Sequence, residues 1–157
     1  MQTNGYIKMQ FRNKNSANRK IVFLDTEFTG ERQHTTLISI ALVTAHGGAI
    51  YLSLNDFDES QVDEWITKNV MDKIEKTTSI TSKVAAQKVH EFLKNYSQGQ
   101  KIYVVSAGLT LDIILLVELF KHLPENKNVD NFAFRNLPNY LNHHHGIDLN
   151  TLLRVAG

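Results

Sequence analysis

The ten residues from Ile21 to Gly30, IVFLDTEFTG, constrain the fold of this chain more than any other segment. They begin with four large apolar residues, which is typical of a strand that is buried on both faces of a sheet. The run ends in two acids, Asp25 and Glu27. Residues two apart on a strand share a face and lie about 6.5–7 Å apart, so these carboxylates should repel each other and raise each other's pKa. The pattern predicts a central strand with an acidic pair at its end.

A divalent cation would relieve that repulsion, because Mg²⁺ and Mn²⁺ prefer carboxylate oxygens as ligands. The alternative is that both acids point into solvent at a strand end, where Thr29 and Gly30 form a turn. The residues downstream favour the metal interpretation.

The size and composition of the chain indicate one ordinary globular domain. Its 157 residues are 42% hydrophobic and 21% charged, which suits a single core built from residues 21–157. The chain has no cysteine, which excludes disulfides and Cys-based zinc sites. No apolar run is long enough to span a bilayer or to act as a signal peptide, so we expect a cytoplasmic protein without a membrane partner.

The first 20 residues differ in charge from the remainder. They carry five basic residues and no acid, whereas the rest has 12 basic and 16 acidic side chains. Such a leader is either a nucleic-acid-binding arm or a solvated, flexible terminus. We favour the flexible terminus.

Two further apolar runs, at residues 35–43 and 49–54, follow the acidic strand. Gly47 and Gly48 lie between them and are typical of a hairpin, because glycine tolerates positive φ. Three consecutive strands with short connections predict an antiparallel meander, which argues against an all-parallel sheet.

Residues 79–96 have apolar side chains at helical spacing, with start signals at Ser79 or Thr81 and a stop at Gly99. An acidic segment with one tryptophan, Trp65, precedes this predicted helix. Trp65 either stacks on a nucleic-acid base or packs on the edge of the core, and the sequence does not decide between the two.

A second strand-to-helix unit places a third acid. Residues 101–105 read as a buried strand, and a helix that is apolar almost all round follows from about Thr110 to Phe120. Asp112 lies in the first turn of that helix, where it either complements the helix N-terminus or faces Asp25 and Glu27 as a third carboxylate. The second role requires the two strands to be adjacent and parallel.

Three motifs, DTEFTG, TLISIALV and VVSAGLTLD, together resemble the DEDD-type 3′→5′ exonucleases of the ribonuclease H-like fold. The chain is most similar to small bacterial and phage exoribonucleases related to oligoribonuclease and ribonuclease T. The resemblance runs from Ile21 to the C-terminus, although Gly108 stands where many members have Asn, and Leu111 where they have Phe. It implies an α/β fold in which an antiparallel three-strand meander joins parallel strands in one mixed sheet flanked by helices.

The resemblance also implies a two-metal phosphodiesterase that uses Mg²⁺ or Mn²⁺. Asp25 would bridge two cations, and Glu27 and Asp112 would complete their shells. One cation would activate water and the other would stabilise the leaving 3′ oxygen. The expected substrate is single-stranded RNA or, less favoured, single-stranded DNA. Members are often dimers, so a homodimer is a further expectation.

By motif position, the resemblance assigns substrate contacts to the end of the acidic strand. Thr29 and Gly30 would lie against the terminal nucleotide. Phe28 would either stack near its base or pack in the core.

The family requires a general-base histidine followed five positions later by a fourth acid, a metal ligand, and His143 and Asp148 have that spacing. Alternatively, Asp148 begins an Asp-x-x-Thr-Leu pattern that precedes this motif in the family. Asp148 would then be structural, His143–His145 would form a loop, and the true pair would lie beyond Gly157. We favour this second interpretation.

Two other functions are compatible with the motifs. One is a nucleic-acid-binding module of this fold without turnover, and the other is a ribonuclease H-type endonuclease, which would cut a heteroduplex internally.

Overall fold

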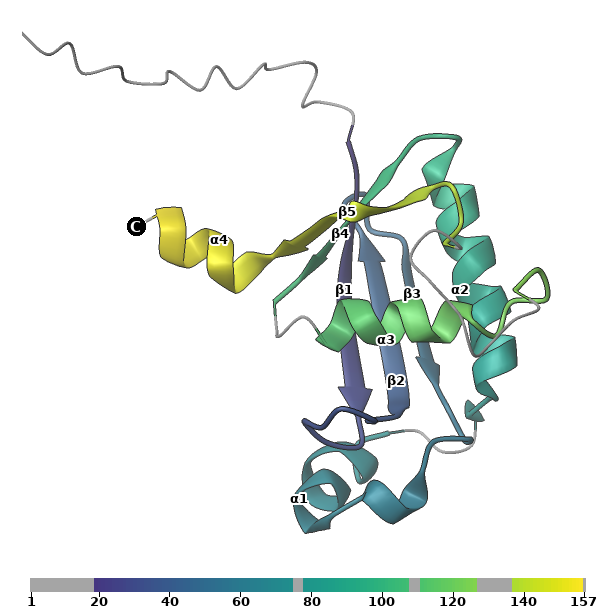
Figure 1. Cartoon of the computed structure of the whole chain (residues 1–157), viewed down its shortest axis with the longest axis vertical. Helices are drawn as coiled ribbons and strands as arrows, with labels where there is room; N and C mark the ends of the chain where they lie inside the picture. The colour runs from purple at the N-terminus through teal and green to yellow at the C-terminus, as the bar shows by residue number, and fades with distance from the viewer. Residues whose placement is uncertain (1–18, 75–77, 108–110, 127–136, 157) are drawn as a thin grey trace, which may run out of the picture.

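A five-stranded sheet in the order β3-β2-β1-β4-β5 forms the centre of the molecule (Figure 1). The computed structural model describes residues 19–74, 78–107, 111–126 and 137–156, and the side chains of 142–145 lie outside this description. The strands are β1 (Lys20–Phe28), β2 (Leu37–Thr44), β3 (Ala49–Ser53), β4 (Ile102–Ser106) and β5 (Leu141–Asp148).

The sheet is mixed, as the sequence predicts. β1 pairs antiparallel with β2, and β2 pairs antiparallel with β3, which makes the meander. β4 lies parallel to β1 on its other side, and β5 lies parallel to β4. The hairpin between β2 and β3 forms at the two glycines: Gly47 has a φ of 89°, and the Thr44 amide donates to the Gly48 carbonyl at 2.7 Å.

Two long helices, α2 (Ser82–Ser97) and α3 (Leu111–Phe120), pack on one face of the sheet, which we call the covered face (Figure 1). Thr81 caps α2, and its hydroxyl accepts from the Val84 amide at 3.5 Å. The helix ends where Gln98 takes the left-handed conformation, with a φ of 49°. The shorter elements are η2 (Glu59–Gln61), α1 (Glu64–Ile66), the π-type turn η3 (Thr67–Met71) and α4 (Leu149–Ala156).

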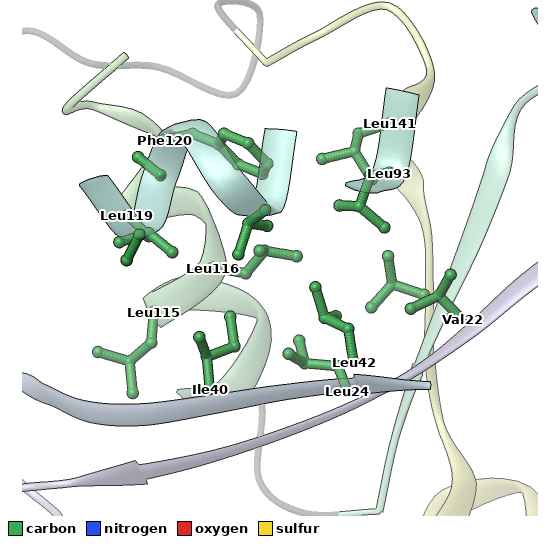
Figure 2. Packing of buried hydrophobic residues seen from close by; sticks show 14 of the residues in the cluster. Val22, Leu24, Ile40, Leu42, Leu93, Leu115, Leu116, Leu119, Phe120 and Leu141 are labelled. Atoms are coloured by element: carbon green, nitrogen blue, oxygen red, sulfur yellow. The ribbon is translucent and has the colours of Figure 1, made fainter. Parts of the chain in front are cut away.

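The hydrophobic core lies between the covered face and these two helices (Figure 2). Alternate residues of β1, Val22 and Leu24, point into it and are 0% and 3% exposed. Leu93 of α2 and Phe120 of α3 are fully buried against them. The apolar character of α3 on nearly all sides is explained by this position, as predicted.

The opposite face of the sheet, which we call the open face, is largely uncovered. Phe23, Val43 and Tyr51 are 46%, 42% and 54% exposed there. The prediction that β1 is buried on both faces is therefore wrong. Among the described residues, α2 and α3 both pack on the other side. The short segment of α1 and η3 packs at one end of the open face, and Leu149 of α4 lines a pocket on it.

An irregularity in the register of β1 with β2 determines where α1 and η3 pack. The pairing of β1 with β2 shifts between Glu27 and Phe28. Leu37 belongs to the main core, but the next residue, Ile38, belongs to a second cluster with Ile66 of α1 and Val70 of η3. The shift therefore turns Ile38 away from the main core and toward α1 and η3, which pack against it beside the end of β1.

The last described elements are the strand β5 and the helix α4, and they correct one prediction. The interpretation in which His143–His145 form a loop is wrong, because these residues lie within β5. Leu141 pairs with Ile102, and Gly146 pairs with Val104, so β5 bulges between them. Residues 142–145 lie in this irregularity, where a single residue of β4, Tyr103, stands opposite four residues of β5.

None of the described helices combines the length and apolar character needed to cross a membrane. Residues 1–18 of the predicted leader lie outside the described residues, so its flexibility stays a prediction.

Candidate functional site

The acidic pair, Asp25 and Glu27, lies on the open face near the carboxyl end of β1. The strand alternates, so Leu24 and Thr26 point to the covered face while both acids are exposed on the other side. The sequence predicts this shared face correctly. The pair is thus accessible to a ligand, at the strand that occupies the centre of the sheet.

The third predicted acid, Asp112, lies in the first turn of α3 and is only 6% exposed. Its Oδ1 accepts a hydrogen bond of 2.6 Å from the Thr26 hydroxyl. β4, which leads toward α3, is the parallel neighbour of β1, so the condition set by the sequence is met. However, Asp112 is bonded to a side chain of the covered face, whereas Asp25 and Glu27 belong to the open face.

The pKa values of Glu27 and Asp112 are both raised, and the charge of Asp25 contributes to each increase. Burial raises the pKa of Glu27, the Asp25 charge raises it further, Lys73 acts in the opposite direction, and Asp112 adds a smaller increase. Burial also raises the pKa of Asp112, the Thr26 hydrogen bond opposes this, and the Asp25 charge adds to the increase. Removal of the acids from water and their mutual repulsion therefore disfavour the charged forms.

The donor set fits a hard divalent cation in part. Within the described residues, no three acidic or histidine side chains converge closely enough to hold a metal ion. Asp25 and Glu27 alone provide oxygen donors on a shared face, which suits Mg²⁺ or Mn²⁺. Asp112 does not converge with them into such a group, and its Oδ1 accepts from the Thr26 hydroxyl.

A pocket of about 350 Å³ adjoins the acidic pair, and we call it the Trp65 pocket. Its lining includes Glu27, Phe28 and Gly30 from the end of β1 and the turn after it, together with Trp65 of α1. Trp65 is 65% exposed, so the interpretation in which it packs on the core edge is wrong. Gly30 has a φ of 137°, a conformation that favours glycine.

Thr29 lies beside this pocket but faces inward. It is fully buried, and its hydroxyl donates to Gln61 Oε1 at 2.7 Å and accepts from the Thr36 amide at 2.9 Å. These bonds join the end of β1 to η2 and to the start of β2. Contact of Thr29 with a nucleotide stays a prediction.

The carboxylate of Asp148 caps α4. Its Oδ1 accepts from the Asn150 amide at 3.1 Å, and its Oδ2 accepts from the Thr151 hydroxyl at 2.5 Å. These bonds, led by that of Thr151, lower the pKa of Asp148. The cap agrees with a structural role for Asp148. The His143 side chain lies outside the described residues, so its assignment as a general base stays a prediction.

A second, smaller hollow of about 140 Å³ on the open face was not anticipated from the sequence. Asp25 and Glu27 line it together with Tyr51, Asn69 and Lys73, and we call it the Lys73 hollow. These last three residues come from β3, from η3 and from just after η3. Only the register of β2 with β3 and the packing of η3 bring them to the acids, and neither follows from local sequence.

Comparison with known proteins identifies the fold. No protein-family model matches the chain, and no curated protein matches its sequence. Among solved structures it is similar to exonuclease I, with a TM-score of 0.57 at 12% identity to one structure of that enzyme. The values are 0.56 at 11% for the metal-free complex of the E. coli enzyme with single-stranded DNA, and 0.55 at 12% for its complex with a dT13 oligonucleotide.

Each of these matches covers 88% of this chain and 30% of the exonuclease I chain. This chain therefore spans less than a third of the length of those neighbours. At such low identity the likeness establishes the architecture alone, which is the ribonuclease H-like α/β fold that the sequence predicts.

Proposed function

We propose that this chain is a metal-dependent 3′→5′ exonuclease that hydrolyses the terminal phosphodiester bond of single-stranded nucleic acid, with RNA favoured over DNA. The observation that carries the proposal is the exposed acidic pair at the end of the central strand, directly beside the Trp65 pocket. The exonuclease I fold and the DEDD-type motifs of the sequence support it.

In this proposal Asp25 and Glu27 hold the metal, and Asp112 completes the ligand set. Two bound cations, Mg²⁺ or Mn²⁺, would supply an activated water and stabilise charge on the leaving 3′ oxygen. The Oδ1 of Asp112 accepts from the Thr26 hydroxyl, and the second oxygen of a carboxylate can bind a metal without breaking that bond. A bound cation would lower the raised pKa values of Asp112 and Glu27, because it would offset the burial and repulsion that disfavour their charged forms.

The Trp65 pocket receives the base of the terminal nucleotide. An exposed indole presents a large flat surface on which any base stacks. Gly30 has no side chain, so the backbone lines the pocket there without filling it. Because Glu27 also lines the pocket, a base bound there would hold its phosphodiester bond close to the acidic pair.

One observation favours a second candidate, a nucleic-acid-binding module without turnover. Asp112 is hydrogen-bonded to Thr26, and the described side chains do not form a complete metal-binding group. The two candidates share the pocket and differ in whether Asp112 joins Asp25 and Glu27 in binding a metal.

The pattern of products tests the proposal. The purified chain is incubated with Mn²⁺ or Mg²⁺ and a 5′-labelled single-stranded RNA, or the matching DNA, and the products are resolved by length. We expect a ladder that shortens from the 3′ end, faster on RNA. An RNA–DNA heteroduplex in parallel reactions would reveal the internal cuts of a ribonuclease H-type endonuclease.

A matched pair of variants separates the site from general effects of charge. Glu27→Gln removes an acid of the pair, whereas Glu91→Gln makes the same change on an exposed position of α2. We expect loss of the ladder with the first variant and no change with the second. Binding of labelled strand without any shortening, in all metal conditions, would instead establish the binding module.

Light scattering on the same samples tests the predicted homodimer.

A further inference from the structure

The Lys73 hollow owes its shape to a small residue between two large ones. Register places Asp25 beside Ala41, and Ala41 beside Tyr51, in one row across β1, β2 and β3. The methyl group of Ala41 makes a low floor, and the carboxylate and the phenol ring stand on either side. Tyr51 is 54% exposed, so its hydroxyl is available at the rim to donate a hydrogen bond.

Lys73 adds a cation to this otherwise acidic hollow. It is exposed, and its charge acts on Glu27 closely enough to oppose the rise in that residue's pKa. In the described part of the chain, Lys73 forms no salt bridge. Its three N–H donors are therefore accessible, and an ammonium group is a common ligand for phosphate.

The hollow and the Trp65 pocket are held together. Glu27 lines both of them. Asn69 of η3 lines the hollow, and its side-chain amide donates to the Trp65 carbonyl at 2.9 Å. The segment from α1 to η3 thus contributes Trp65 to one cavity and Asn69 to the other, and Glu27 lines both.

From this arrangement we propose that the Lys73 hollow is a subsite for a backbone phosphate of the bound strand, in which Lys73 supplies the charge and Tyr51 and Asn69 line the site. The inference rests on the proposed function, because it takes a nucleotide in the Trp65 pocket as its starting point. It assigns to Lys73 a binding role that is separate from metal coordination. The base and the phosphate of the substrate would then be recognised in two cavities that share Glu27 as a lining residue.

The salt dependence of binding tests this subsite without relying on turnover. Affinity for a fluorescein-labelled single-stranded oligonucleotide is measured by fluorescence anisotropy at KCl concentrations from about 50 to about 200 mM. Salt weakens phosphate contacts in this range, because each contact releases about one counterion from the nucleic acid. The Asp25→Asn background is used so that the strand stays intact. Each phosphate contact to a single strand contributes about 0.7 to the slope of log affinity against log salt. We expect Lys73→Met to reduce the slope by about that amount.

Two further variants make the test specific. Lys88→Met removes the same charge from an exposed position on α2, on the covered side of the sheet, and should leave the slope unchanged. Lys73→Arg keeps the charge and should retain most of it. In the otherwise native chain, Lys73→Met should raise KM about tenfold, as expected from loss of one charge-assisted hydrogen bond, with a smaller effect on kcat.

The outcomes for the subsite and for the proposed function are distinct. An unchanged slope for Lys73→Met, or a loss equal to that of Lys88→Met, would overturn the subsite even if the native chain degrades RNA. A loss of slope specific to Lys73 would support the subsite even if the native chain shows no turnover, which would then count against the exonuclease alone. A lower melting temperature with an unchanged slope would mean that Lys73 only compensates the charge of Glu27.

Discussion

The two faces of β1 are built from alternate residues of the same strand and have opposite properties. Val22 and Leu24 point into a close-packed core under α2 and α3, whereas Phe23 and Asp25 point to a face that is largely exposed. The core gives β1 a rigid position, because its inward side chains are fixed by packing. Asp25 and Glu27 point outward from the same strand, so the packed core fixes their backbone while their side chains stay exposed. Substitutions on the two faces should therefore affect different properties.

The largest effect is expected at Asp25 and should be confined to activity. Asp25→Asn should reduce nuclease turnover at least about a thousandfold, because loss of metal-based charge stabilisation is worth several kcal/mol of barrier. The melting temperature should stay within a few degrees of that of the native chain, since the side chain is exposed and outside the core. Turnover assays and thermal unfolding measure the two properties. Loss of folding in this variant would mean that Asp25 is structural.

The next effect contrasts neighbouring residues of β1 in stability. Leu24→Ala on the covered face should cost about 2–5 kcal/mol of unfolding free energy, because it leaves a cavity in the core. Phe23→Ala on the open face should cost about 1 kcal/mol or less, since the ring is 46% exposed. Urea denaturation gives both values.

An equal cost at Phe23 and Leu24 would contradict this difference between the faces. It would mean that something covers the open face in solution. Repeating the denaturation at several protein concentrations would then tell whether a second copy of the chain does so, because the stability of a dimer depends on concentration.

A smaller effect is expected at the Trp65 pocket. Trp65→Ala should weaken binding of a single strand by about 1–3 kcal/mol, the usual contribution of one stacked base, and Trp65→Phe should restore part of it. Fluorescence anisotropy in the Asp25→Asn background measures the affinity. Because the ring is exposed, neither change should lower the stability. Equal affinity of the alanine variant and the parent would show that no base binds in this pocket.

Local sequence was sufficient for those parts of the structure that depend on short-range patterns. The meander follows from the apolar runs and from Gly47 and Gly48, and α3 follows from a long apolar segment after a strand. The shared face of Asp25 and Glu27 follows from strand geometry alone. The placement of Asp112 at the same end of the sheet as Asp25 and Glu27 required β1 and β4 to be parallel neighbours. The structure shows that they are.

The remaining features depend on contacts between distant segments. Four consecutive apolar residues in β1 conceal the alternation that leaves Phe23 exposed, because a run of apolar residues has no periodicity to read. The inward position of Thr29 depends on Gln61, 32 residues away. Similarly, the meeting of Lys73 with Glu27 depends on how η3 packs. Such contacts are set by tertiary structure, which a pattern of residue types does not specify.

The smallest predicted effect concerns Asp112, the buried acid that is hydrogen-bonded to Thr26. Its folded-state pKa is raised, mainly by burial, so its protonated form stabilises the fold at pH values below its unfolded pKa of about 3.9. That stabilisation is lost as the pH rises through the folded-state pKa. Asp112→Asn keeps an oxygen that accepts from Thr26 and carries no charge. At pH 7 it should therefore be more stable than the native chain by about 1 kcal/mol, which corresponds to about 2–4 °C in melting temperature.

The advantage of Asp112→Asn should shrink as the pH falls toward 4, because the native carboxylate then becomes protonated. Mn²⁺ should also reverse it, since a ligand that binds the folded state stabilises it and only the native chain retains the full set of acids. Thermal unfolding at pH 7 and pH 4, with and without Mn²⁺, measures both effects. A variant that is less stable than the native chain at pH 7 would show that the charged Thr26–Asp112 hydrogen bond outweighs the burial of the carboxylate. In that case Asp112 would belong to the core rather than to a metal site, and the binding module would become the better description of the chain.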